Sequence, residues 1–219
     1  MPDERHRAVT AGADAARYRP PVTLRRTLAR AYWRLSRWTL KTERVPADGA
    51  GLLIGAPHTS NWDFILMLAI SGEADLTIRW LGKHQLFTGP AGPLMRALGG
   101  IPVDRRDPAG LVDELVARIQ GGDRFYLVVT PEGTRSGSGW KSGFYRIARA
   151  TDLPVTLGYV DRTTMTAGLG PTLRLTGDVP ADMDVVRAFY ADKSGFVPSR
   201  RTEPRLREEL PQADGPPTA

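Results

Sequence analysis

The stretch GLLIGAPHTSNWD, residues 51–63, contains the transition that decides the fold. Its first six residues form an apolar run that ends at Pro57, which predicts a buried strand over 51–56. Apolar residues then recur at helical spacing over 61–71, so a strand passes directly into a helix. This order is typical of the strand–helix units from which parallel sheets are built.

The same alternation continues towards the C-terminus. Further strands are predicted at 76–81, 100–103, 124–130, 154–160, 164–167 and 172–176, and helices at 93–98, 108–120, 142–150 and 182–192. We therefore expect an α/β fold, a single domain over residues 46–195 with a mostly parallel mixed sheet flanked by helices. Polar residues 1–20 are predicted to be flexible. The Pro-, Arg- and Glu-rich residues 196–219 are predicted to be disordered.

Composition excludes several classes of protein. A chain of 219 residues with 41% hydrophobic residues suits one globular domain, and the absence of cysteine excludes a disulfide scaffold, zinc–thiolate sites and a cysteine nucleophile. The longest apolar run, residues 64–70, is too short to span a bilayer, and residues 1–19 contain no apolar segment typical of a signal peptide. We expect a cytoplasmic protein.

The formal charge of +6 is unevenly distributed. Residues 1–50 contain 11 Lys/Arg against 5 Asp/Glu, whereas residues 51–219 contain 19 of each. A basic amphipathic helix over 22–42 is the main feature of the first part. Its apolar stripe consists of Leu24, Leu28, Ala31, Leu35 and Trp38, and its basic side of Arg26, Arg30, Arg34, Arg37 and Lys41.

Two interpretations of this helix remain open. Residues 21–45 can dock on the anionic inner face of a membrane, with the apolar stripe among acyl chains and the arginines on headgroups. Alternatively, the stripe packs on the domain and the arginines are solvated. The neutral remainder of the chain argues against a nucleic-acid surface, so nucleic acid is not an expected partner.

The loop after the first strand contains a candidate base and its partner. If His58 precedes the helix, Asp63 can reach back to one imidazole nitrogen, fix the tautomer and leave the other nitrogen free to accept a proton. We expect such a base to activate a substrate hydroxyl. The alternative is structural, because Ser60 and Asp63 also match a capping box at a helix start.

Two later loops have the composition of phosphate-binding sites. GGIPVDRR at 99–106 ends in paired arginines, and PEGTRSGSG at 131–139 directly follows an apolar strand. Arginine forks and the N–H groups of glycine-rich turns both suit a phosphate. Each loop taken separately favours the alternative, a surface hairpin whose arginines are solvated. No P-loop motif is present.

Together, HTSNWD (58–63), GGIPVDRR (99–106) and PEGTRS (131–136) resemble the glycerophospholipid acyltransferases, in particular the 1-acyl-sn-glycerol-3-phosphate acyltransferases. The resemblance covers about residues 50–160. It implies that His58 is the general base and Asp63 its charge partner. It also implies a phosphate site, formed by Arg105, Glu132, Gly133, Thr134 and Arg135.

The resemblance further implies the reaction. A fatty acyl group would pass from acyl-CoA or acyl carrier protein to the free hydroxyl of a lysophospholipid, with no metal and no bound cofactor. Two alternatives stay open: another lyso-lipid or a glycolipid as acceptor, or a non-catalytic membrane-binding protein. The expected location is peripheral, on the cytoplasmic face of the membrane.

Overall fold

The computed structural model describes residues 24–43, 49–103, 108–122, 124–132 and 139–209. Within these ranges the fold is built on a seven-stranded sheet of order β1-β7-β6-β2-β5-β3-β4. The strands are β1 (Thr39–Leu40), β2 (Gly51–Ala56), β3 (Ile78–Lys83), β4 (Gly100–Val103), β5 (Tyr126–Val129), β6 (Val155–Asp161) and β7 (Thr166–Leu173).

The sheet is mixed and mostly parallel, which confirms the predicted fold class. Only the β6–β7 pair is antiparallel among the described strands. The prediction of two short strands at 164–167 and 172–176 is wrong, because β7 runs through the Gly/Pro-rich stretch between them. The glycines there permit close packing: a Cβ at Gly168 would lie 1.7 Å from the Lys41 carbonyl oxygen.

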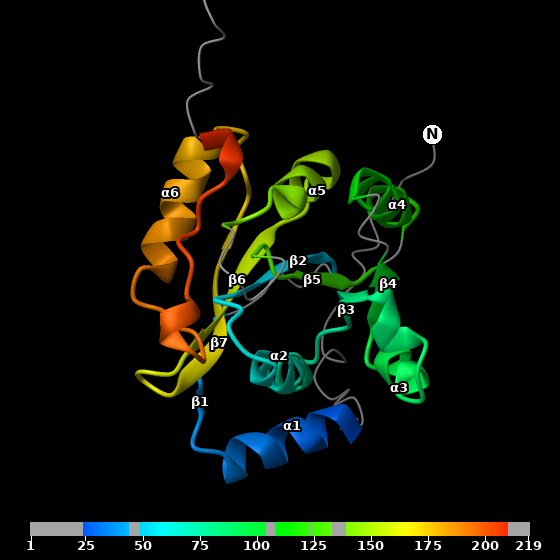
Figure 1. Cartoon of the computed structure of the whole chain (residues 1–219), viewed down its shortest axis with the longest axis vertical. Helices are drawn as coiled ribbons and strands as arrows, with labels where there is room; N and C mark the ends of the chain where they lie inside the picture. The colour runs from blue at the N-terminus through cyan, green and yellow to red at the C-terminus, as the bar shows by residue number, and fades with distance from the viewer. Residues whose placement is uncertain (1–23, 44–48, 104–107, 123, 133–138, 210–219) are drawn as a thin grey trace, which may run out of the picture.

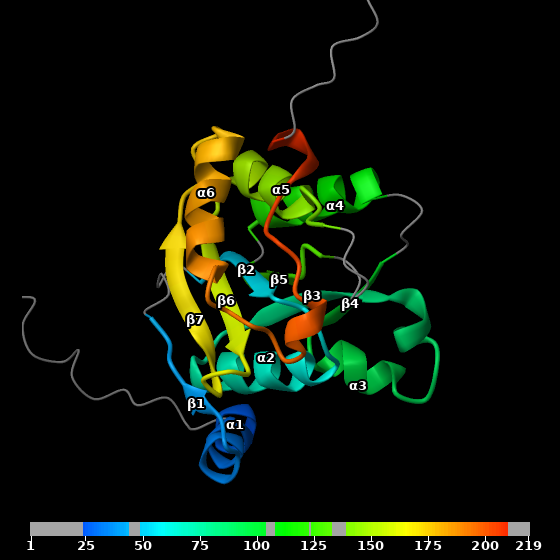
Figure 2. The same cartoon turned by 60° about the vertical axis from the view of Figure 1, so that its left-hand side comes forward.

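Helices cover both faces of the sheet (Figures 1 and 2). One side has α1, α2 and α3, and the other has α4, α5 and α6. Their bounds are α1 (Leu24–Leu35), α2 (Trp62–Glu73), α3 (Gly92–Ala97), α4 (Pro108–Gln120), α5 (Gly143–Thr151) and α6 (Val179–Tyr190), with 3₁₀ turns η1 (His84–Phe87), η2 (Pro198–Arg200) and η3 (Arg207–Glu209). None of the helices within the described ranges is long and apolar enough to cross a membrane.

Strand β2 lies at the centre of the sheet and is buried on both faces. Leu52 and Ile54 belong to the cluster under α5 and α6, whereas Leu53 packs with Leu66 and Ile70 of α2. Because neither face meets water, every side chain of such a strand is apolar, which explains the uninterrupted run in the sequence. The loop that follows β2 is thereby fixed to the most buried strand.

Helix α1 differs from its prediction in length and orientation. It ends at Leu35, and Trp38 beyond it is buried and stacks on Phe196. The apolar stripe faces solvent, with Leu24, Leu28 and Leu35 exposed by 73%, 61% and 87%. The interpretation that this stripe packs on the domain is therefore wrong for the three leucines, whereas Trp38 does pack on the domain.

The contact face of α1 is a different side of the helix. Ala29 lies so close to α2 that a Cβ at Gly72 would be 2.9 Å from its methyl group. The Trp33 indole donates to the Ala69 carbonyl oxygen, and Arg30 contacts Glu73 at 3.4 Å. Part of the basic side thus faces α2, while the leucines remain available to another partner.

The C-terminal segment is structured as far as residue 209, so the prediction of disorder is wrong for residues 196–209; residues 210–219 lie outside the described ranges. Leu206 is 1% exposed and belongs to the core under α5 and α6. A single buried residue of this kind gives no periodic apolar pattern. The Pro-, Arg- and Glu-rich composition of the segment therefore led to a prediction of disorder. We call residues 194–206 the C-terminal strap. It runs from the end of α6 past the start of α2 (Figure 2).

Candidate active site

The site begins at the carboxyl end of β2, where parallel α/β sheets place their ligands. The chain leaves the strand at Ala56, and residues 57–61 form a loop before α2 starts at Trp62. His58 lies in this loop with its side chain 26% exposed, so solvent or a substrate can reach it. Asp63 lies in the first turn of α2 and is almost buried.

His58 and Asp63 lie close together, as predicted. The His58 Nδ1 atom is 3.3 Å from the Asp63 Oδ2 atom. Because His58 precedes the helix, the five-residue separation does not turn the two side chains apart. A proton on Nδ1 directed at the carboxylate leaves Nε2 as the basic nitrogen.

Asp63 also organises the loop backbone. Its Oδ2 atom accepts hydrogen bonds from the N–H groups of Thr59 and Ser60, each at 2.7 Å. The Ser60 hydroxyl accepts from the Trp62 N–H at 3.2 Å. The predicted capping box forms only in part: Asp63 accepts the Ser60 N–H, but the N-cap residue of α2 is Asn61, and its side chain makes no cap hydrogen bond. Within the described ranges, the Oδ1 atom of Asp63 is buried and has no hydrogen-bond partner.

Glu132 enters the site from the neighbouring strand. Ile54 of β2 pairs with Val129 of β5, so the residues just beyond the two strands emerge at the same level. Glu132 is 2% exposed, and its Oε2 atom accepts the His58 N–H at 2.5 Å. Two carboxylates thus contact His58, one from the first turn of α2 and one from the loop after β5.

The environment of Glu132 perturbs its ionisation. Burial raises the pKa of the Glu132 carboxyl above its ordinary value, because the charged form loses its hydration. Hydrogen bonds from the His58 N–H and the Thr202 hydroxyl act in the opposite direction but do not cancel this effect. Perturbed carboxyl groups of this kind cluster at functional sites.

The predicted phosphate site is described only in part. Glu132 has both carboxylate oxygens engaged by the protein, one by His58 and the other by Thr202 at 3.2 Å. The remaining predicted residues lie outside the described ranges: Arg105, Gly133, Thr134 and Arg135. Their roles stay predictions.

The paired glycines of GGIPVDRR have a packing role. Gly99 adopts a φ of +90°, and its N–H donates to the Arg96 carbonyl oxygen. A Cβ at Gly100 would lie 2.7 Å from both the Trp80 and Phe87 rings. These two residues let β4 lie against the aromatic cluster beside β3, and the Gly99 N–H is not free to bind an anion.

Sequence reasoning missed the contribution of the C-terminal strap. The Val197 N–H donates to the Thr59 hydroxyl at 2.9 Å, and Thr202 donates to Glu132. Thr59 is fully buried in the loop next to His58. These partners are 138 and 70 residues apart in the chain, and neither strap residue belongs to a recognisable motif, so no local signal identifies them.

A histidine paired with a carboxylate, at the carboxyl end of a central parallel strand, is an arrangement that can accept a proton from a hydroxyl group. The family model described as Acyltransferase matches residues 38–160, more than half of the chain. The chain belongs to the acyltransferase family, and the resemblance to glycerophospholipid acyltransferases seen in the three motifs is confirmed.

Two known proteins show the same relationship. The 1-acyl-sn-glycerol-3-phosphate acyltransferase of Streptococcus pneumoniae is 27% identical over 120 residues, 52% of this chain and 44% of that protein. The chain thus spans less than half the length of that relative. The crystal structure of the 1-acyl-sn-glycerophosphate (LPA) acyltransferase PlsC from Thermotoga maritima matches with a TM-score of 0.56 at 16% identity, over 75% of this chain and 74% of that one. This second match shows a shared fold.

Proposed function

We propose that the protein transfers a fatty acyl group from an acyl thioester, acyl-CoA or acyl carrier protein, to the free hydroxyl of 1-acyl-sn-glycerol-3-phosphate, giving phosphatidic acid. The observation that carries this proposal is the 3.3 Å contact between His58 and Asp63 in a chain of the acyltransferase family. The activity for which the Streptococcus relative is named supports the choice of acceptor.

The chemistry follows from the histidine tautomer. With Nδ1–H directed at Asp63, the Nε2 atom of His58 accepts the proton of the acceptor hydroxyl as its oxygen bonds to the thioester carbonyl carbon. When the carbon–sulfur bond breaks, the proton passes from His58 to the departing thiolate. The products are the new ester and a free thiol. This scheme assigns no role to a covalent acyl-enzyme, a metal or a bound cofactor.

Glu132 supports this chemistry indirectly in the proposed scheme. Its buried carboxylate holds the His58 N–H, which fixes the backbone from which the imidazole projects. Precise orientation of a base is worth orders of magnitude in rate, because a misplaced base loses the reactive geometry. For the acceptor phosphate we propose Arg105 and Arg135, with Gly133 and Thr134, on the basis of the resemblance of their motifs.

Helix α1 suits a peripheral location at the inner face of the membrane. Its exposed leucines offer an apolar stripe, and the basic residues of the same N-terminal region favour anionic headgroups. A lysophospholipid resides in the bilayer, whereas acyl-CoA and acyl carrier protein come from water. Docking through residues 22–42 would bring the site to the acceptor.

The test is an acyl-transfer assay with acyl-CoA and 1-acyl-sn-glycerol-3-phosphate. We expect His58→Ala to lower turnover by about 10²–10⁴-fold, the usual contribution of general-base catalysis. The exposed His84 on η1 provides the matched control, and His84→Ala should retain the parental rate. Thermal unfolding of each variant shows whether the fold is intact.

Three outcomes would contradict the proposal. Equal turnover by the parent and His58→Ala would show that His58 is not the general base. Equal use of a monoacylglycerol, which lacks the phosphate, would favour a different acceptor. Binding to vesicles without any acyl transfer from either donor would favour a non-catalytic membrane-binding protein.

A further inference from the structure

The C-terminal strap is attached at its start to the end of β6. Asp161, 4% exposed, accepts the Ser194 hydroxyl at 2.5 Å. The Gly195 N–H donates to the Val160 carbonyl oxygen at 3.0 Å, and the Arg162 N–H donates back to the Gly195 carbonyl oxygen at 3.1 Å. The strap therefore leaves the sheet at the same edge from which His58 projects.

The middle of the strap contacts both neighbours of His58. Gly195 lies so close that a Cβ there would be 3.1 Å from the Pro57 Cβ and 2.9 Å from the Thr59 Cγ2. Its φ of +69° is strained for other residues, so glycine meets both a steric and a backbone requirement. The Val197 N–H then donates to the Thr59 hydroxyl at 2.9 Å. These contacts restrict the loop on either side of the base.

Thr202 reaches His58 through one carboxylate. Its hydroxyl donates to the Glu132 Oε1 atom at 3.2 Å, while the Glu132 Oε2 atom accepts the His58 N–H at 2.5 Å. Glu132 is almost inaccessible to solvent, so water does not readily replace a missing donor. The position of Thr202 therefore affects the orientation of the carboxylate and, through it, of the His58 backbone.

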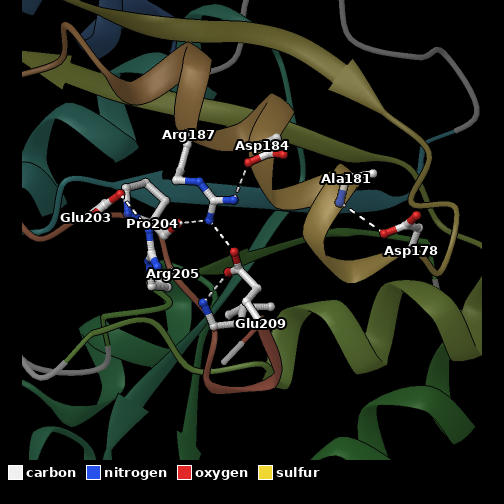
Figure 3. A network of polar contacts seen from close by, with 9 residues as sticks. Asp178, Ala181, Asp184, Arg187, Glu203, Pro204, Arg205 and Glu209 are labelled. Carbon is white, nitrogen blue, oxygen red and sulfur yellow. Dashed lines mark hydrogen bonds and ion pairs between the residues drawn. The ribbon is translucent and has the colours of Figure 1, made fainter. Parts of the chain in front are cut away.

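The far end of the strap is attached to α6 (Figure 3). Arg187 donates to the Pro204 carbonyl oxygen at 3.1 Å and pairs with the Glu209 carboxylate. Leu206 is buried in the core, and its N–H donates to the Glu209 carboxylate at 2.6 Å. The strap is thus attached on both sides of Thr202.

We propose that the C-terminal strap positions the general base, and that Thr202 is its positioning residue. This inference rests on the proposed acyl transfer. Removing the Thr202 hydroxyl leaves a buried carboxylate oxygen without its donor, so Glu132 reorients and the His58 loop shifts. The effect falls on the chemical step and leaves substrate binding largely unchanged.

The test compares Thr202→Val, Thr202→Ser and Thr151→Val. Thr202 is partly exposed, so the valine variant is expected to fold, and serine restores the hydroxyl. Thr151 is the matched control, because its hydroxyl donates to the Ile147 carbonyl oxygen within α5, away from the site. The probes are acyl-CoA and 1-acyl-sn-glycerol-3-phosphate, together with the ¹H–¹⁵N resonance of the His58 backbone amide.

We expect Thr202→Val to lower kcat by about tenfold with KM within about twofold of the parent, as a small displacement of a base would. The His58 amide resonance should move in this variant. Thr202→Ser should restore both kcat and the resonance, and Thr151→Val should leave both unchanged.

The outcomes distinguish a failure of the positioning role of the strap from a failure of the proposed acyl transfer. A parental kcat together with an unmoved His58 resonance in Thr202→Val would overturn the positioning role, as would equal losses in Thr151→Val. If the parent itself transfers no acyl group, the proposed function fails, while the His58 resonance still decides whether Thr202 acts on the loop. Should Thr202→Val not fold, Thr202→Ala gives the same comparison.

Discussion

Helix α1 and the C-terminal strap flank the domain at opposite ends of the chain and differ in almost every respect. The sequence of α1 is strongly periodic, yet its leucine stripe points into solvent. The strap has no periodic pattern, yet Leu206 lies in the core and Val197 contacts the loop that contains His58.

A periodic sequence pattern predicts secondary structure, but it does not predict which side of an element contacts the rest of the protein. Periodicity predicted that residues near 24–35 form a helix, but not which side meets the protein. That side was decided by Ala29 and Gly72, whose small size lets α1 and α2 approach closely. The strap depends on single anchors instead. The leucine stripe of α1 is thus exposed to an external partner, whereas the C-terminal strap packs against the candidate site.

A leucine-to-alanine substitution in the strap and one in α1 should give the largest difference, which is in the free energy of unfolding. Leu206→Ala should lower the free energy of unfolding by about 2–4 kcal/mol, because it removes a fully buried side chain and leaves a cavity. Leu28→Ala should change it by less than about 0.5 kcal/mol, because Leu28 is 61% exposed. Urea denaturation of both variants measures the difference, and equal losses would show that α1 is packed as tightly as the strap.

For membrane binding, in contrast to stability, substitutions in α1 should have the larger effect. Leu28→Ser combined with Leu35→Ser removes two exposed apolar side chains of α1 without changing the charge. We expect partitioning onto vesicles containing anionic phospholipid to fall by about tenfold or more, since each leucine loses its transfer into the acyl region. Sedimentation with the vesicles gives the partition coefficient.

Val185→Ser provides the matched control, because Val185 is 51% exposed on α6, in the opposite helix layer. Its partitioning should equal that of the parent. A loss in Val185→Ser as large as that in the α1 variant would place the membrane contact elsewhere.

The smallest effect concerns the pH dependence of stability. Burial raises the folded-state pKa of Glu132, so the folded state holds this proton more tightly than the unfolded state does. The contribution of Glu132 to the free energy of unfolding is therefore fully present below the unfolded pKa and is lost as pH rises through the folded pKa. Glu132→Gln does not undergo this loss. Relative to the parent, its free energy of unfolding should therefore increase as pH rises above the ordinary carboxyl pKa of about 4.

Asp182 supplies a control of opposite sign. Burial opposes the shift, but hydrogen bonds from Tyr145 and Thr176 lower the pKa of the Asp182 carboxyl below its ordinary value. Its contribution is present above the unfolded pKa and is lost as pH falls. The advantage of the parent over Asp182→Asn should thus shrink in acid. A pH-independent difference between the parent and Glu132→Gln would show that Glu132 titrates alike in both states.

Much of the fold was predictable because its signals are local. The apolar run of β2 and the strand–helix alternation identified the parallel sheet, and the short spacing of His58 and Asp63 identified the pair. The residues of strand β1 were wrongly predicted as part of the helix over 22–42. Two residues are too few to form a strand pattern, and their pairing with β7 depends on a distant strand.

The rest of the site depends on contacts between distant parts of the chain. Glu132 meets His58 only because β5 lies beside β2 in a defined register, which the sequence of either strand alone does not specify. Thr202 needs the further condition that Leu206 and Arg187 hold the strap in place. Such contacts follow from the assembled tertiary structure and not from any single motif.

The central place of β2 has a consequence for the growing chain. Its sheet partners begin at Tyr126 and Val155, long after its own residues have been translated. At roughly 5–20 residues per second, the strand waits for several seconds before a neighbour is available. During that interval the apolar run GLLIGA lacks its native sheet partners, which leaves it open to aggregation in the nascent protein.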